Sequence, residues 1–348
     1  MARRSDGPTG RRSNAPPRIR DVAAAAGVSY QTVSRVLNDS PNVHPDTRQT
    51  VLDVIERLQY RPNRAARALG SGRAAGVTVV TADTMLYGYA ATLRGIEEAA
   101  RLRGLSVGVR VVDSDRVDEV RHAVEYVSDP SAGSVVVVAF DSAGAAVLRG
   151  LPADVPAVGA TEAGGLANVA RTMLFLDERQ AAEDATRHLL SLGHRTVHHV
   201  AIPSETGTSA RQAGWRAVLE QAGAAVPPVV SAGWEPESAF QAGRALAADP
   251  EVTAILCGND DTALVVRRAL YAVGRDVPGD VSVVGFDDVP GAAYWTPALT
   301  TVRMDFAALG RACLAAVVAE VTGVPQPTVT FEAPCLMVRE STAPPRSR

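Results

Sequence analysis

From residue 77 onward, short runs rich in Val and Ile alternate with longer amphipathic stretches, and this alternation constrains the fold more than any other feature of the chain. The runs are typical of buried strands and span residues 77–81, 105–112, 134–140, 197–202, 252–257 and 281–286. The stretches with helical periodicity lie near residues 89–103, 117–128, 178–192, 209–222, 236–248 and 260–274. Such alternation predicts parallel sheets with helices on both faces. Because it continues over most of the 348 residues, we expect an α/β core of two doubly wound parallel-sheet subdomains that face each other across a cleft.

The charge of the chain is distributed unevenly. Residues 1–73 contain 13 Arg and 6 acidic residues, a net charge of +7, whereas the whole chain carries −3. The remaining residues therefore contain 22 Arg and 32 acidic residues, a net charge of −10. One end of the chain is thus suited to a polyanion such as nucleic acid.

The basic end carries the pattern of an all-α helix-turn-helix headpiece over residues 18–63. An Ala-rich helix over residues 20–26 is expected to end at Gly27. Ser29 is expected to cap a second helix, which runs from residue 30 to about residue 37. Pro45 suits the first turn of a third helix. Two short helices with a glycine-containing turn between them form a helix-turn-helix.

Exposed polar side chains on the second helix are suited to DNA. Gln31 can bond adenine and Arg35 can bond guanine, each contributing about 1–3 kcal/mol of discrimination, and Tyr30 and Ser34 lie beside them. Other side chains are placed to contact phosphates, namely Ser29, Thr32, Asn38, Thr47 and Tyr60. A helix-turn-helix that mediates only protein contacts is the alternative, and the local charge of +7 argues against it.

The segments on either side of the headpiece have a different character. Residues 1–17 lack apolar periodicity and predict a disordered basic arm. Residues 64–74 contain a helix-compatible stretch that ends at Gly70. Because a helix this short is marginal in water, we expect a conditional hinge helix or linker.

Polar side chains follow several of the predicted strands, where ligands bind in open α/β sheets. These residues are Asp83, Asp141, Asn259 and Asp287. With Arg211 and Trp234 on nearby loops they could hold several hydroxyl groups and one flat apolar face, which describes a sugar better than a phosphate. The alternative is that they only cap the following helices.

The sequence argues against an enzyme. It lacks GxxxxGK[ST], GxSxG and HExxH, and no GxGxxG opens a helix after a strand. Asp287 and Asp288 form a carboxylate pair but have no nucleophile nearby in the sequence. His198 and His199 are neighbours on a strand and point to opposite faces, which disfavours a shared metal ion. We therefore expect no catalysis, no metal and no cofactor.

Two further features concern location and redox chemistry. No apolar run is long enough to span a membrane, and no apolar stretch follows the arginine-rich start, so we expect a cytoplasmic protein without a membrane partner. Cys257, Cys313 and Cys335 lie far apart in the sequence and are expected to be buried thiols rather than disulfide or zinc ligands.

The residues also resemble a known family, the lactose/galactose repressor (LacI/GalR) family of transcriptional regulators. In the headpiece the likeness rests on IRDVA at 19–23, GVSYQTVSRVLN at 27–38 and YRPN at 60–63. In the core it rests on LGHR at 192–195, SARQAGW at 209–215, ND at 259–260, VSVVGFDD at 281–288 and PALTTVR at 297–303.

For DNA recognition, the resemblance implies that Tyr30, Gln31 and Arg35 read bases in the major groove. Leu69 matches a hinge leucine that wedges into the minor groove, with Asn63 and Ala66 beside it.

For the core, the resemblance implies a fold like that of periplasmic sugar-binding proteins. Its subdomains would be residues 75–173 with 305–332, and residues 174–304 with 333–341, followed by a tail at 342–348. Arg211, Asn259 and Asp287 match residues that bond sugar hydroxyls, Trp234 matches an aromatic platform, and Phe306 lies at an apolar position of the site. Thr161 and Ala82 stand where a member of the family has a sugar-contacting Asp and a Ser, so the identity of the sugar does not transfer.

The function expected from the sequence is a repressor of sugar-utilisation genes. It would bind a pseudo-palindromic double-stranded DNA operator as a homodimer and be released by a small sugar inducer such as a galactoside or glucoside. No leucine heptads follow Glu340, so no tetramer-forming tail is expected. Two alternatives remain: the same fold with a nucleobase or another metabolite as co-repressor, and a sugar-binding protein without a DNA function.

Overall fold

The computed structural model of the chain forms two compact units, residues 1–73 and residues 74–348. It describes residues 19–37, 40, 42–58, 60, 76–162, 166, 168–204, 209–326, 330 and 332–346. The predicted basic arm at 1–17 and hinge at 64–74 lie outside the described residues, as do four of the DNA-binding candidates: Asn38, Asn63, Ala66 and Leu69.

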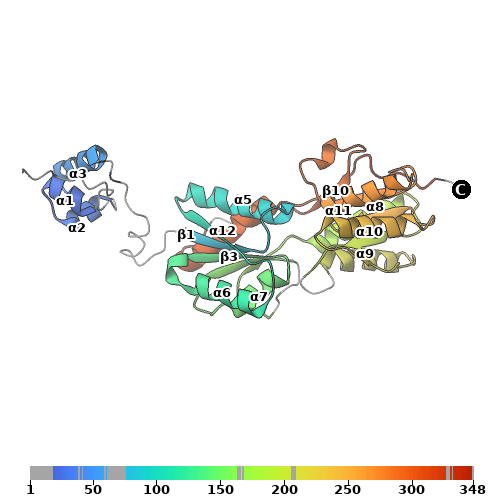
Figure 1. The fold of residues 1–348 in the computed structure, drawn as a ribbon, viewed down its shortest axis with the longest axis horizontal. Helices are drawn as coiled ribbons and strands as arrows, with labels where there is room; N and C mark the ends of the chain where they lie inside the picture. Colours follow the sequence, from blue (N-terminus) through green and yellow to red (C-terminus); the bar gives the residue numbers. More distant parts are fainter. Residues whose placement is uncertain are drawn as a thin grey trace, which may run out of the picture. The chain divides into compact units, whose positions relative to one another are not determined.

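The first unit contains the predicted helix-turn-helix, and the three predicted helices are confirmed (Figure 1). They are α1 (Ile19–Ala26), α2 (Tyr30–Leu37) and α3 (Pro45–Leu58). Gly27 has a φ of +67°, a left-handed conformation that glycine adopts without strain and that ends α1. The N–H of Thr32 donates to Ser29 Oγ over 3.1 Å, which caps α2. A small valine-rich core joins the helices, and its buried valines are Val22, Val33, Val36, Val51 and Val54.

The second unit contains two sheets, each the centre of one lobe. Sheet A defines the first lobe and is entirely parallel, with the strand order β2-β1-β3-β4-β5. Its strands are β1 (Gly76–Thr81), β2 (Ser106–Val111), β3 (Ser134–Ala139), β4 (Ala157–Thr161) and β5 (Met173–Leu174). Its helices are α5 (Tyr87–Leu102), α6 (Val117–Ser128), α7 (Ser142–Gly150) and α12 (Phe306–Thr322), and a 3-10 turn, η1 (Pro130–Ala132), precedes β3.

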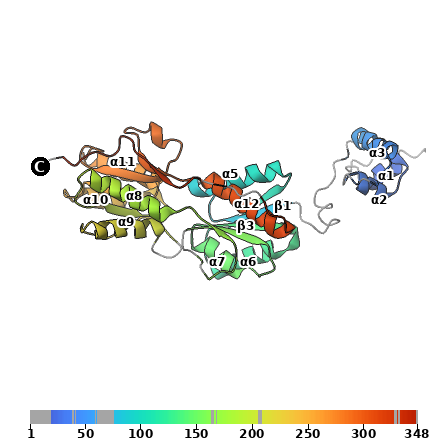
Figure 2. The ribbon, with the colours of Figure 1, turned by 180° about the vertical axis from the view of Figure 1, so that it is seen from behind.

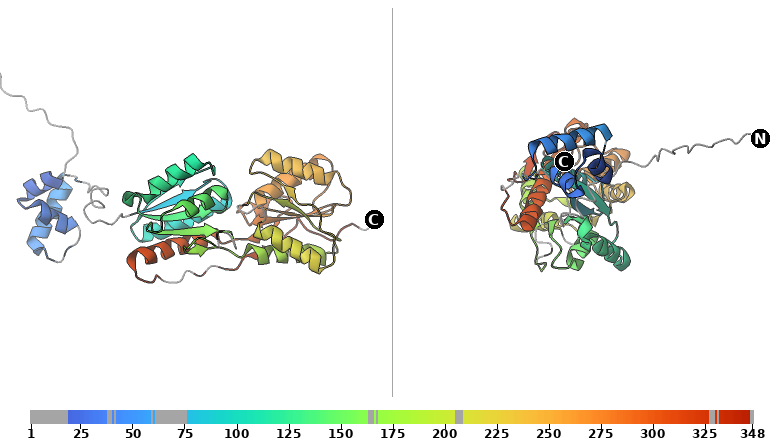
Figure 3. Two further views of the ribbon diagram at one scale, coloured as in Figure 1. Left: turned by 90° about the horizontal axis from the view of Figure 1, so that it is seen from below. Right: turned by 90° about the vertical axis from the view of Figure 1, so that its left-hand side faces the viewer.

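Helices cover both faces of sheet A because its strands are apolar on both faces. Val77 and Val79 pack with α5 and α12 on one face, whereas Val80 and Val135 pack with α6 and α7 on the other. Figure 3 shows α12 and the α6–α7 pair on opposite sides of the sheet. The helix α12 comes late in the chain and packs against α5, which places residues 306–322 in the first lobe.

Sheet B defines the second lobe, with the strand order β11-β10-β9-β8-β6-β7. Its strands are β6 (His198–Ala201), β7 (Val230–Ser231), β8 (Ala254–Cys257), β9 (Ser282–Asp287), β10 (Thr300–Arg303) and β11 (Cys335–Met337). Its helices are α8 (Glu178–Ser191), α9 (Ala210–Gln221), α10 (Pro236–Ala247) and α11 (Asp260–Ala272), and the 3-10 turn η2 (Ala292–Tyr294) precedes β10. Apolar residues of α8 and α9 cover one face of the sheet, and those of α10 and α11 cover the other (Figure 2).

The expected α/β core of two sheets with helices on both faces is therefore confirmed, with differences in detail. The edge strand β11 is antiparallel to β10, so sheet B is not purely parallel. Cys335 lies on this edge strand and is exposed, which corrects the expectation that all three thiols are buried. The elements that periodicity did not predict are the strands β4, β5, β7, β10 and β11 and the helices α7 and α12.

The chain segment after β11 is part of the second lobe as far as it is described. The backbone of Val283 donates to the carbonyl of Ser341, and the N–H of Ala343 donates to Ser282 Oγ over 3.0 Å. Arg346 pairs with Asp280 over 2.8 Å. Residues 341–346 thus extend the packing of the second lobe beyond the edge strand.

His199 gives the second lobe a pH dependence. It is fully buried on β6, its Nδ1 lies 2.9 Å from the carbonyl oxygen of Leu256, and burial lowers the pKa of its imidazole from 6.5 to about 4. Below pH 6.5 the unfolded chain therefore binds a proton that the folded chain does not, so folding stability falls as the pH drops from 6.5 towards 4, by up to about 3 kcal/mol.

Replacing this residue, His199→Asn, keeps a donor near the Leu256 carbonyl and removes the titrating ring. Urea unfolding at pH 7, 6 and 5 should show a shallower loss of stability in this variant than in the wild type. The other histidines are present in both proteins, so the difference isolates His199. Equal slopes in the two proteins would contradict this assignment.

Candidate effector pocket and nucleic-acid interface

The helix α2 presents one face to the headpiece core and the other to solvent. Val33 and Val36 are buried, whereas Tyr30, Gln31 and Arg35 are exposed. An exposed aromatic ring, amide and guanidinium on one short helix match the groups that read base edges in a major groove.

The remaining described DNA-binding candidates have partly structural roles. Ser29 Oγ lies 2.9 Å from Thr32 Oγ1, so both hydroxyls take part in capping α2. Ser34 and Thr47 are half-buried. Tyr60 packs against the headpiece core, and its N–H donates to the carbonyl of Ile55.

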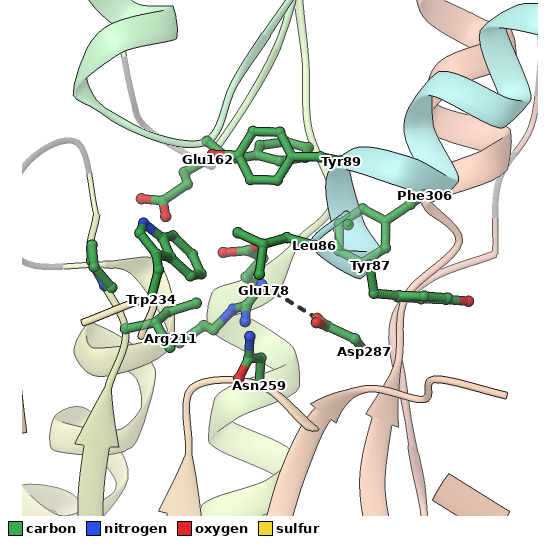
Figure 4. Close-up of a pocket in the computed structure, with 14 residues that line it drawn as sticks. Leu86, Tyr87, Tyr89, Glu162, Glu178, Arg211, Trp234, Asn259, Asp287 and Phe306 are labelled. Atoms are coloured by element: carbon green, nitrogen blue, oxygen red, sulfur yellow. Dashed lines mark hydrogen bonds and ion pairs between the residues drawn. The ribbon is translucent and has the colours of Figure 1, made fainter. Parts of the chain in front are cut away.

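In the second unit a pocket lies where parallel strands of both sheets end (Figure 4). Its lining comes from both lobes and consists of Leu86, Tyr87, Gly88, Tyr89, Phe140, Glu162, Glu178, Ile202, Pro203, Arg211, Trp234, Asn259, Asp287 and Phe306. Ligand pockets of small-molecule binding proteins have this mixture of apolar and polar groups.

Arg211, in the first turn of α9, is the centre of the polar side of the pocket. Its guanidinium is buried, lies 2.9 Å from Glu178 Oε1 and 3.7 Å from Asp287 Oδ1, and donates to the carbonyl of Gly258. It also stacks over the ring of Phe286, 4.3 Å from the ring centroid. Burial alone would lower the pKa of Arg211, but Glu178 and Asp287 hold that pKa above its usual value. The guanidinium is therefore a fixed positive charge.

Asp287 enters the pocket from the end of β9 on a strained turn. Its φ is +110° and that of Asp288 is +53°, values that residues with a Cβ rarely adopt and that cost on the order of 1–3 kcal/mol each. Ion pairs from Asp288 to Arg303 (2.9 Å) and Arg339 (2.6 Å) stabilise the turn. Burial raises the pKa of Asp287 well above its usual value, and Arg211 only partly offsets this effect.

Asn259 has two roles. Its Oδ1 accepts from the N–H of Thr262 over 2.8 Å and caps α11, as the capping alternative predicts. Its amide nitrogen points towards Arg211 and the pocket in Figure 4. The cap thus fixes the orientation in which the amide is available to a ligand.

The first lobe contributes an aromatic wall. The ring of Phe306 lies 5.9 Å from that of Phe140 and 6.2 Å from that of Tyr87, measured between centroids. Gly88 permits this approach, because a Cβ there would lie 3.2 Å from the Phe306 ring. Trp234 stands on the opposite side of the pocket and is 37% exposed. The pocket therefore combines apolar rings with hydrogen-bonding groups, as a sugar requires.

The structure brings five of the seven predicted ligand-binding residues into the pocket lining: Arg211, Trp234, Asn259, Asp287 and Phe306. The other two, Asp83 and Asp141, are not part of it. The Asp83 carboxylate accepts from the N–H groups of Met85 and Leu86, and Asp141 accepts from Gly144 N and Tyr89 Oη. The Asp83 carboxylate thus stabilises the turn before α5, and the Asp141 carboxylate caps α7.

Several lining residues were missed by the sequence reasoning. Glu178 begins α8 directly after its cap, Asp177, and Glu162 directly follows β4. The rule that ligand groups follow strand ends would have found Glu162 if β4 had been predicted. This rule does not identify Glu178, Tyr87 or Tyr89, because they lie in helices and not directly after a strand.

Other kinds of site were also considered. Among the described residues, no group of three or more His, Cys, Asp or Glu side chains is arranged to hold a metal ion. None of the helices within the described ranges is both long enough and apolar enough to cross a membrane.

Comparison with known proteins places the chain in a family. The model of the bacterial regulatory proteins, lacI family, matches residues 18–63, and that of the periplasmic binding protein-like domain matches residues 186–342. The lactose operon repressor of Escherichia coli (strain K12) is 32% identical over 314 residues, which cover 85% of this chain and 82% of that protein.

Two solved structures are similar over nearly the whole chain. One is the lac repressor dimer bound to operator and the anti-inducer ONPF, with 28% identity and a TM-score of 0.82, covering 94% of this chain and all of that one. The other is a complex of the transcriptional regulator CelR with cellobiose, with 29% identity and a TM-score of 0.67, covering 93% and 99%. The chain belongs to the LacI family of transcriptional regulators.

The buried ion pair between Glu178 and Arg211 gives a stability prediction. Glu178→Ala leaves a buried guanidinium without its nearest carboxylate and should lower the free energy of unfolding by about 3 kcal/mol. Glu183→Ala, on the same helix, removes pairs with the exposed Arg179 and Arg187 and should cost less, about 1 kcal/mol. Urea unfolding of both variants checks this, and similar losses in the two would contradict the role given to Glu178.

Proposed function

We propose that this protein is a transcriptional repressor whose affinity for a DNA operator is controlled by a small sugar. The observation that carries the proposal is that one chain contains both an exposed Gln31–Arg35 face on a helix-turn-helix and a pocket that joins aromatic rings to a fixed polar cluster. The relatives support it, since one is named the lactose operon repressor and one structural neighbour is a complex with cellobiose.

On this proposal two headpieces of a homodimer bind the two halves of a pseudo-palindromic site. Tyr30, Gln31 and Arg35 contact base edges, and the hydroxyls of Ser29 and Thr32 lie near phosphates. The lac repressor neighbour is described as a dimer on its operator, which supports the same arrangement here. Contacts from Asn38, Asn63, Ala66 and Leu69 remain predictions.

The sugar would lie between the two lobes. Its hydroxyls would bond Arg211, Asn259 and Asp287, and its apolar faces would contact Trp234 and Phe306. A sugar that contacts both lobes binds best at one relative arrangement of the lobes, and this difference in affinity is what can shift the protein away from the DNA-binding state. A nucleobase co-repressor is less well supported, because the polar groups of the pocket exceed what a flat ring needs.

The double substitution Gln31→Ala with Arg35→Ala tests the DNA-reading face. An operator is first selected from a random duplex library with the wild-type protein. Loss of two base contacts should then reduce the preference for that operator over random duplex by at least about 30-fold. The matched control, Gln49→Ala with Arg57→Ala, removes the same residue types from exposed positions on α3 and should keep the preference.

A mobility-shift titration of the same operator complex with galactosides and glucosides tests the sugar response. The proposal expects release by at least one of these sugars. Retention of the complex with every sugar, or an unchanged preference in the Gln31/Arg35 variant, would contradict it.

A further inference from the structure

The pocket contains more negative than positive charge. Among the described residues that line it, Glu162, Glu178 and Asp287 are acidic, and Arg211 is the one arginine or lysine. The neighbouring residues 163–165 and 205–208 lie outside the described part of the chain and contain no basic side chain in the sequence. Burial raises the pKa of Asp287 and so favours its neutral form. If Asp287 is left out of the charge count, the described lining of the pocket still contains two glutamates and a single guanidinium.

The buried carboxylates also have unused acceptor atoms. Glu178 Oε2 and Asp287 Oδ1 are buried and have no hydrogen-bond partner, and the two side chains are only 7% and 9% exposed. The Arg211 guanidinium lies 3.7 Å from Asp287 Oδ1, an ion pair that is too long for a hydrogen bond. Buried acceptors without a hydrogen bond are costly, so a ligand that donates hydrogen bonds to them is favoured. Hydroxyl groups can donate in this way, whereas a carboxylate or a phosphate dianion can only accept.

Arg211 does not compensate for this imbalance. Its guanidinium already pairs with Glu178 and donates to the carbonyl of Gly258. The positive charge of Arg211 is therefore already offset by Glu178 and Asp287, and an anionic ligand would meet the acidic groups without a second cation among the described lining residues. This is unfavourable in a partly desolvated pocket.

Glu162 is an acidic lining residue of the first lobe that also contacts the second lobe. It follows β4 of the first lobe, and its Oε2 accepts from Ser204 Oγ, just beyond β6 of the second lobe, over 2.8 Å. Figure 4 shows its carboxylate on the side of the pocket where Trp234 stands. A ligand held between Trp234 and the polar cluster would therefore meet this carboxylate.

We infer that the pocket selects carbohydrates without acidic groups and rejects uronates and phosphorylated sugars, with Glu162 as a specificity-determining residue. This inference rests on the proposed function, because it concerns the same pocket. It assigns to Glu162 a contact with a ligand hydroxyl and the exclusion of a negative charge at that point.

Isothermal titration calorimetry on the full chain tests the inference with matched probes. The probes are galactose, galacturonate, glucose, glucuronate, glucose 6-phosphate, lactose and cellobiose. At least one neutral sugar should bind, and its acidic counterpart should bind at least about 30-fold more weakly. Glu162→Gln keeps the size of the side chain but removes its charge. It should reduce the ratio of the affinities for the neutral and the acidic sugar at least about fivefold.

The control variant is Glu220→Gln, at the far end of the helix that carries Arg211, where the side chain is exposed. It should leave the ratio of the affinities for neutral and acidic sugars unchanged. Thermal unfolding of both variants verifies that they are folded. An acidic sugar that binds the wild type as tightly as its neutral counterpart would overturn the inference. So would an equal affinity ratio in the two variants, or binding of an acidic sugar by a protein that binds none of the neutral ones. Failure of every sugar, neutral and acidic, or failure of the wild type to bind any operator, would instead contradict the proposed function.

Discussion

The buried guanidinium of Arg211 is the interaction on which the polar side of the pocket depends. It joins three segments that are distant in sequence: the start of α8 through Glu178, the end of β8 through the Gly258 carbonyl, and the end of β9 through Asp287. A charge in this position must be paired, because an unpaired buried ion destabilises a fold by several kcal/mol. The ion pairs that stabilise the second lobe therefore also fix the positions of the polar side chains that face a ligand.

The two lobes contribute different chemistry to the same pocket. The second lobe provides the buried charges of Glu178, Arg211 and Asp287 and the Asn259 amide. The first lobe provides the rings of Tyr87, Phe140 and Phe306 and the carboxylate of Glu162. A ligand with both hydroxyls and apolar faces is bound fully only when the two sets are in place together. Ligand affinity then depends on how the lobes are arranged, and on the proposed function this dependence is what would let a sugar influence the DNA-binding headpiece.

The sequence predicted the parts of the structure that periodicity and strand ends determine. The helices of the headpiece and most core strands follow from apolar spacing, and Asn259 and Asp287 follow from their positions after strands. The same reasoning could not separate them from Asp83 and Asp141, because Asn259 and Asp141 both follow a strand and both cap the next helix. Only the three-dimensional structure shows that Asn259 also lines the pocket and that Asp83 and Asp141 do not. The helix α7 was missed because it is only nine residues long, and β4 because it is short and contains Gly159. Glu178 depends on a long-range partner, which no local pattern shows.

The measurement that tests the central claim most directly is the affinity of an inducing sugar for the free protein and for the protein saturated with its operator. Binding of sugar and operator to one dimer is reciprocal, so the factor by which two bound sugars weaken operator binding must equal the product of the factors by which operator weakens sugar binding at the two pockets. The account predicts a sugar affinity that is at least about tenfold lower on the operator complex, with operator binding weakened by the corresponding product. The same sugar affinity with and without operator would contradict it.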